Sequence, residues 1–146
     1  MIGDKKISIL AIDDEPSILG TLEGILTDEG YRMFAAVSGP KGLSILMREK
    51  IDTVLLDVWM PGMDGIETLE KIKKIYPEVS VILLSGHGNK ETVAKAFQLG
   101  ASDFLSKPIS LDNLLDSIEE VTRKRQQKRV RKTGPPSRRS ISFETH

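Results

Sequence analysis

The sequence predicts an α/β fold, a doubly wound parallel sheet of five strands with helices on both faces. Two observations support this fold class. Five short apolar runs alternate with stretches whose apolar residues recur at helical spacing. Most of the runs are apolar almost without interruption, as expected for parallel strands that are buried on both faces. We therefore expect right-handed crossovers and a ligand site beyond the carboxyl ends of the strands.

The first half of the domain holds two strand–helix units. A continuous apolar strand is expected at 7–12. Pro16 suits the first turn of the helix that follows, and Gly30 ends that helix after a series of leucines and isoleucines at helical spacing. A second strand is expected at 31–37, and the spacing of leucine and methionine predicts a helix over 39–50.

The remaining three units follow the same pattern. The third strand, 53–56, precedes a helix that Asp64 can cap and that carries apolar residues at helical spacing. The last expected elements are a strand at 79–84, a helix through 93–99, a strand at 103–106 and a helix whose apolar spacing runs from 111 to 121.

Charge divides the chain into an acidic body and a basic tail. Acidic and basic residues number 21 each, so the formal net charge is zero. Nine of the basic residues but only one acidic residue lie in 123–146. We expect one domain at 1–122 and, at 123–146, a basic extension of the last helix followed by a linker or tail, since "TGPPSRRS" has linker composition.

The tail bears on the choice of partners. Its lysines and arginines have the charge to contact nucleic acid phosphates, although such charge runs are more often solvated. The 146 residues leave no room for an effector domain. We expect either a stand-alone domain or, as the basic linker favours, a piece of a longer protein with an effector domain beyond the tail.

Composition excludes several classes of site. The chain has no cysteine, which excludes disulfides and thiolate chemistry, and only two histidines, which disfavours a transition-metal site. His87 is then more simply a loop residue. The apolar run at 7–12 is too short for a signal sequence or a membrane span. We expect a cytoplasmic protein with no membrane association.

Charged and hydroxyl side chains stand at the carboxyl ends of several predicted strands. Asp13 and Asp14 end the first strand, Asp57 ends the third, Ser85 ends the fourth, and Lys107 follows the fifth. A buried carboxylate is costly unless it is paired. A parallel sheet gathers these side chains at one edge, so Asp57 would lie beside two further carboxylates and within reach of an ammonium.

This combination of groups suits phosphoryl transfer. Three carboxylates repel one another, and a divalent cation relieves the repulsion; an all-oxygen ligand set favours a hard ion such as Mg²⁺. A carboxylate beside Mg²⁺ can act as a nucleophile and form an aspartyl phosphate. Lys107 would stabilise charge on the transferred oxygens, Ser85 could bond one of them, and Gly86 leaves room for the phosphodonor.

The stretches "IDDEP", "LLDVWMPGMDG", "ILLSGHG" and "FLSKP" occur in this order along the chain. Together they resemble the receiver domain of two-component response regulators over about residues 7–122, and look most like receivers of nitrogen-regulatory activators. The resemblance implies a flavodoxin-like fold with strand order 2-1-3-4-5. It also implies a signalling switch that takes its phosphoryl group from a histidine kinase, and not an enzyme that turns over a substrate.

The resemblance implies a role for each acidic residue. Asp57 is the expected phosphoacceptor. Asp13 and Asp14 are the acidic pair that holds Mg²⁺, with Asp57 and the backbone carbonyl of Trp59 as further ligands. The expected cofactor is therefore Mg²⁺.

A switch mechanism is implied as well. Ser85 matches the switch hydroxyl, Lys107 the lysine that pairs with the phosphate, and Phe104 the switch aromatic. Phosphorylation would draw Ser85 toward the phosphoryl group and let Phe104 turn into the space it leaves. The surface of the fourth helix, fifth strand and fifth helix would change, and this surface is a candidate homodimer interface.

Several of these residues have simpler interpretations. Asp13 and Asp14 could cap the first helix, and Ser85 with Gly86 could form a plain turn. Phe104, taken alone, is better interpreted as a core residue. The sequence leaves these alternatives open.

Two other functions compete with the phosphorylated switch. A phosphohydrolase with an aspartate nucleophile commonly has a second acid two residues later, but Trp59 stands there. A module that binds a partner without being phosphorylated is the other alternative, against which the intact acidic set argues. A dinucleotide-binding domain is disfavoured because no G-x-G-x-x-G follows the first strand.

Trp59→Asn should shorten the lifetime of the phosphorylated protein. In receivers, the residues two positions after the acceptor and two after the switch hydroxyl flank the path of the hydrolytic water; here they are Trp59 and His87. The bulky indole should exclude water, which outweighs any water oriented by His87. We expect decay about tenfold faster in the variant, equivalent to about 1.4 kcal/mol of barrier, when intact mass is followed in time. Equal or slower decay would mean that the indole does not shield the site.

Overall fold

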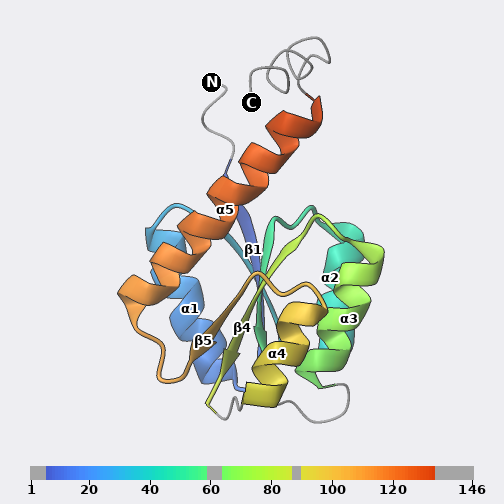
Figure 1. Ribbon diagram of the computed structural model, residues 1–146. Helices are drawn as coiled ribbons and strands as arrows, with labels where there is room; N and C mark the ends of the chain where they lie inside the picture. Colours follow the sequence, from blue (N-terminus) through green and yellow to red (C-terminus); the bar gives the residue numbers. More distant parts are fainter. Residues whose placement is uncertain (1–5, 59–63, 87–89, 134–146) are drawn as a thin grey trace.

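We describe the protein from a computed structural model, in which a five-stranded sheet lies between two layers of helices (Figure 1). The structure describes residues 6–58, 64–86 and 90–133. The strands are β1 (Ser8–Ile12), β2 (Arg32–Ala36), β3 (Thr53–Asp57), β4 (Ser80–Ser85) and β5 (Asp103–Ser106). The helices are α1 (Pro16–Asp28), α2 (Gly39–Arg48), α3 (Gly65–Ile75), α4 (Lys90–Gln98) and α5 (Leu111–Thr133).

The sheet is parallel throughout, with the strand order β2-β1-β3-β4-β5. This confirms the predicted fold class and strand order. The chain leaves β1 toward β2 on one side and later returns to β3 on the other, so the order reverses between β1 and β3. Ile12 and Leu56 are paired across these two strands. The residues that follow them therefore emerge together at the position where open α/β sheets bind ligands.

Each face of the sheet has its own hydrophobic core. α1 and α5 cover one face, and α2, α3 and α4 cover the other (Figure 1). Alternate residues of one strand serve the two cores: Ile9 and Leu55 pack toward α1 and α5, whereas Leu10 and Leu56 pack toward the other layer. Because both faces are buried, the central strands are continuously apolar instead of alternating.

Local sequence signals set most helix ends. Pro16 begins α1, and Gly30 has a φ of +96° just beyond its last turn, a conformation that favours glycine. Asp64 caps α3, because its carboxylate accepts the backbone N–H of Glu67 at 2.8 Å. These three predictions are confirmed. α4 begins at Lys90, earlier than the apolar spacing at 93–99 indicated. Residues 90–92 are polar and partly or fully exposed to solvent, so they gave no apolar signal for the start of the helix.

α5 continues well beyond its apolar face, and Arg125 fastens this extension to the domain. The Arg125 guanidinium lies 2.6 Å from a carboxylate oxygen of Asp52 and donates through Nε to the backbone carbonyl of Glu78 at 2.8 Å. The other Asp52 oxygen accepts the N–H of Ser8 at 2.8 Å. One side chain thus ties α5 to the starts of β1 and β3 and to the loop before β4. No helix in the described ranges is long and apolar enough to cross a membrane.

Arg125→Met should destabilise the domain by about 2 kcal/mol, because it leaves the mostly buried Asp52 carboxylate without its counter-charge while keeping part of the apolar stem. The measurement is the midpoint of urea unfolding followed by circular dichroism. Arg123→Met is the matched control, since Arg123 lies on the same helix in an exposed ion pair with Glu120. The control should leave the midpoint nearly unchanged; equal midpoints for the two variants would contradict the anchoring role.

Candidate functional site

Three aspartates meet at the carboxyl edge of the sheet. Asp13 and Asp14 directly follow β1, and Asp57 is the last residue of β3. Each offers a carboxylate oxygen, and these oxygens all lie within 4.8 Å of one another. Asp13 is 2% exposed and Asp57 is 5% exposed, whereas Asp14 is exposed to solvent. The edge therefore concentrates negative charge that is only partly accessible to water.

Lys107 supplies the positive charge among these acids. Its Nζ lies 3.1 Å from Asp13 Oδ2 and 3.5 Å from Asp57 Oδ1. Burial of the ammonium acts to lower the pKa of Lys107, but the hydrogen bond and charge of Asp13, together with Asp57, outweigh burial and raise this pKa above its ordinary value. Lys107 therefore stays charged at neutral pH and bridges two strands.

The backbone around these groups holds them in place. The N–H of Glu15 donates to Asp13 Oδ1 at 2.9 Å, which orients this carboxylate at the start of α1. The N–H of Lys107 donates to the Ser85 carbonyl at 2.8 Å, and the Lys107–Pro108 peptide bond is cis. The N-cap position of α1 belongs to Glu15, which makes no side-chain capping hydrogen bond. The alternative that Asp13 or Asp14 caps the first helix is therefore wrong, because Asp13 lies two residues before the cap position and bonds the backbone of Glu15 itself.

Gly65 was not identified from the sequence, although it borders the site. A Cβ on this residue would collide with the carbonyl oxygen of Asp57 and would lie 2.5 Å from Val58 Cα. The Gly65 N–H also donates to the Val58 carbonyl at 2.8 Å. Both neighbours are backbone atoms at the end of β3, so a side chain here would displace the strand that carries Asp57. The Asp64–Gly65 pair before a helix was the available signal.

Ser85 and Phe104 lie near one another on neighbouring strands. Ser85 ends β4 and is 1% exposed, and it is paired with Ser106 of β5. Phe104 is paired with Leu83, two residues before Ser85, so Ser85 and Phe104 lie on the same face of the sheet. Phe104 is partly buried against the core beneath α3 and α4. Its core contact and a switch role are therefore compatible.

Other residues singled out from the sequence lie outside the described part of the chain. These are Trp59, with its backbone carbonyl, and His87. Their expected roles beside the acidic group stay predictions. Gly86, by contrast, is described and exposed, with only Lys107 Cβ near the position that a Cβ of its own would take.

An apolar groove of about 350 Å³ adjoins Lys107. One wall is α1, with Ile18 and Leu22, and the other is the segment from Pro108 to Leu114. Sequence analysis did not identify it, because neither wall is unusual on its own. The groove forms only when the loop after β5 packs beside α1.

The donor set fits a divalent cation. Three carboxylates face a single ammonium, so negative charge remains in excess within this group. Carboxylate oxygens are the ligands that hard ions such as Mg²⁺ prefer, and Mg²⁺ usually takes one or two of them and keeps several waters. The exposure of Asp14 leaves one side of the acidic group open to such a hydrated ion.

Comparison with known proteins places this geometry in a family. A family model for the response regulator receiver domain matches residues 9–119. The chain is 42% identical over 115 residues to the nitrogen assimilation regulatory protein NtrX of Azorhizobium caulinodans, a match that covers 77% of this chain and 25% of that protein. The chain thus spans about a quarter of the length of that relative.

Two further matches cover nearly all of the other protein. The sporulation initiation phosphotransferase F of Bacillus subtilis is 36% identical over 112 residues, covering 77% of this chain and 90% of that protein. The solved receiver domain protein from Methanospirillum hungatei has a TM-score of 0.82 at 30% identity, covering 85% of this chain and 99% of the other. The resemblance seen in the sequence motifs is therefore confirmed: the chain belongs to the receiver domain family of two-component response regulators.

Proposed function

We propose that this receiver domain is a Mg²⁺-dependent switch that accepts a phosphoryl group on Asp57. The observation that carries the proposal is the bridging ammonium of Lys107, 3.1 Å from Asp13 and 3.5 Å from Asp57. An ion pair with a purely structural role would need only one carboxylate beside the ammonium. Here two carboxylates contact Lys107, and a third, from Asp14, lies beside them, as a cation site requires.

In the proposed reaction, a carboxylate oxygen of Asp57 attacks the phosphorus of the donor. A new oxygen–phosphorus bond forms, and the bond between phosphorus and the donor's leaving group breaks, with its electron pair going to the leaving group. Lys107 would then turn its ammonium toward the phosphoryl oxygens. Hydrolysis of the acyl phosphate by water restores the Asp57 carboxylate and releases inorganic phosphate.

Asp13, Asp14 and Asp57 would hold the metal, together with the backbone carbonyl of Trp59. When bound, Mg²⁺ supplies positive charge beside the phosphoryl oxygens. Other side chains of the site would bind and orient the phosphoryl group. Asp13 holds Lys107 at 3.1 Å before transfer, and the Ser85 hydroxyl would bond a phosphoryl oxygen after it.

A histidine kinase is the proposed phosphodonor. The family relationship supports this partner, as does the Bacillus subtilis relative, which is a sporulation initiation phosphotransferase. The apolar groove between α1 and the segment after Lys107 gives a partner a surface beside the acceptor. Further candidate partners are an effector domain beyond the tail, supported by the NtrX relative, of which the match covers only 25%, and a second copy through α4, β5 and α5.

Two alternatives are separated from this proposal by simple assays. A phosphohydrolase would turn over a generic phosphate ester, which we do not expect from a site without an acid at position 59. A module that works without phosphorylation would bind its partner equally well when Asp57 is replaced. The acidic group favours the phosphorylated switch over both.

Asp57→Asn should abolish labelling by acetyl phosphate. With Mg²⁺, the parent should gain the mass of one phosphoryl group in a base-labile form, whereas the variant lacks the nucleophilic oxygen. Removal of divalent metal with a chelator should also suppress labelling of the parent, because the acids would then repel the donor. Intact-mass spectrometry measures both effects.

Asp28→Asn is the matched control for this experiment, since it makes the same chemical change at an exposed residue at the end of α1. The control should be labelled like the parent. Labelling of Asp57→Asn to the same extent as the control would show that the acceptor is another residue.

Phosphorylation should also change amide exchange along 85–110. We expect Ser85 to move toward the phosphoryl group and Phe104 to turn further into the core, because the two side chains share one face of neighbouring strands. Exchange measured by mass spectrometry, with and without a phosphoryl mimic such as beryllofluoride, tests this. Changes confined to the segment next to Asp57 would contradict the switch.

A further inference from the structure

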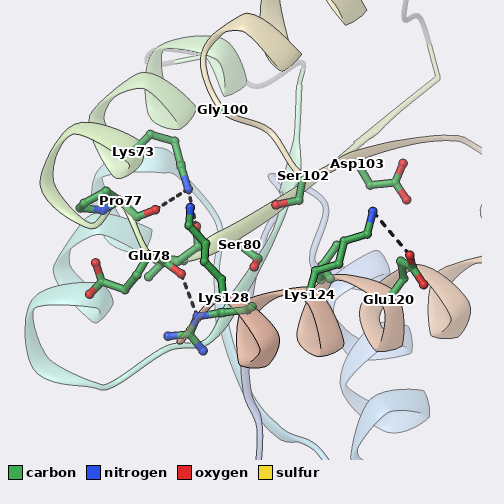
Figure 2. Close-up of a pocket in the computed structure, with 13 residues that line it drawn as sticks. Lys73, Pro77, Glu78, Ser80, Gly100, Ser102, Asp103, Glu120, Lys124 and Lys128 are labelled. Carbon is green, nitrogen blue, oxygen red and sulfur yellow. Dashed lines mark hydrogen bonds and ion pairs between the residues drawn. The ribbon is translucent and has the colours of Figure 1, made fainter. Parts of the chain in front are cut away.

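A pocket lined by charged and polar side chains lies at the end of the sheet opposite to the acidic group, apart from the apolar groove beside Lys107. Its volume is about 580 Å³. Ser80 and Asp103, the first residues of β4 and β5, line it, whereas Asp57 and Ser85 stand at the last residues of β3 and β4. The end of α3 and the extension of α5 form its walls (Figure 2). None of the residues proposed for phosphoryl transfer lines this pocket.

Four cationic side chains line the pocket: Lys73 from α3, and Lys124, Arg125 and Lys128 from α5. Lysine has three N–H donors and arginine has five. Lys73 uses two of its donors on the carbonyls of Pro77 and Val79, at 2.7 and 2.8 Å. Lys128 has no hydrogen-bond or ion-pair partner within the described part of the chain. Donors on both helices therefore remain available to a ligand.

The ammonium groups of Lys73 and Lys128 face one another. Figure 2 shows the two side chains reaching toward each other from opposite walls. Burial lowers the pKa of Lys73 below its ordinary value, and the neighbouring charge of Lys128 lowers it further. Glu78 opposes this with a smaller effect than that of Lys128, and Arg125 adds a still smaller lowering. Like charges held together in this way are stabilised by an anion placed between them.

The acids around the pocket leave this pair of lysines largely uncompensated. The Asp103 carboxylate accepts the Ser117 hydroxyl at 2.6 Å and the N–H of Phe104 at 2.8 Å. Glu120 is paired with Arg123 and Lys124. The Glu78 carboxylate points away from the lysine pair in Figure 2, and its backbone carbonyl is bonded by Arg125.

We propose that this pocket binds a small phosphate-bearing molecule, with phosphate oxygens held between Lys73 and Lys128. A phosphate group offers several acceptor oxygens and up to two negative charges, which matches two ammonium groups with unused donors. The pocket falls in the volume range of small-molecule sites and exceeds the size of the phosphate group alone. Inorganic phosphate, pyrophosphate and phosphate esters share this chemistry.

Such a ligand would join α3 and α5, which both hold the turn before β4. Lys73 holds that turn by the carbonyls of Pro77 and Val79, and Arg125 holds it by the carbonyl of Glu78. A phosphate group between α3 and α5 would fasten the α5 extension from a second side. The site would thus regulate how firmly the basic extension is held to the domain.

The test is a titration of the whole chain with inorganic phosphate, pyrophosphate and glycerol 2-phosphate. A chelator removes divalent metal so that the acidic group repels phosphate, and potassium chloride keeps the ionic strength constant. Backbone amide spectra should show saturable shifts at 73–80, 100–103 and 120–128, and the thermal midpoint should rise with ligand concentration. Tighter binding of the ester than of the two inorganic ions would identify an organic phosphate as the ligand class; weaker binding would identify an inorganic one.

Lys128→Gln should weaken binding about tenfold, because it removes one charge-assisted contact at an exposed position that does not disturb folding. Lys74→Gln is the matched control: it makes the same change at an exposed residue of α3 that does not line the pocket, and it should keep the parent affinity. Three results would overturn the proposal. They are no saturation by about 10 mM ligand, equal weakening by the two variants, and shifts centred on Asp57 and Lys107.

Discussion

Two carboxylates, those of Asp13 and Asp57, are almost fully buried at one edge of the sheet, and the ammonium of Lys107 lies between them. Removing carboxylates from water costs several kcal/mol each unless charge and hydrogen bonds compensate it. Lys107 offsets only part of this charge, because Asp14 adds a third carboxylate. The arrangement therefore attracts cations and opposes anions until a cation is present. Under the proposed function, Asp57 would for this reason depend on a metal ion to react with a phosphodonor.

The fold brings this charge together through the reversal of strand order between β1 and β3. Close packing at the end of β3 then fixes Asp57, since Gly65 leaves no space for a side chain against its backbone. The hydroxyl of Ser85 and the ring of Phe104 extend the site along one face of β4 and β5. Under the proposed function, a change of charge at Asp57 would reach the outer strand through Ser85 and Phe104, which lie on this one face.

α5 connects the two ends of the molecule. Leu114 and Ile118 pack in the core beneath it, Ser117 bonds Asp103 at the start of β5, and Arg125 reaches Asp52. Its extension is therefore part of the domain's hydrogen-bond network and not only a connection to the tail. The basic residues that remain on this extension meet Lys73 of α3, where the proposed phosphate pocket lies. The molecule thus has an acidic edge and, at the opposite end of the sheet, a basic one.

The sequence alone determined the order of strands and helices, the Asp64 cap, the Gly30 terminus and the set of residues at the strand ends, because these depend on periodicity and on backbone preferences within a few residues. It also carried the family motifs. Only the tertiary structure decided which of these side chains touch: Lys107 meets Asp13 across 94 residues of chain and Asp57 across 50. The sequence likewise showed no sign of three other features: the close contact at Gly65, the Arg125–Asp52 pair and the pocket between α3 and α5. Each of them forms between two segments whose separation is set by packing between distant elements.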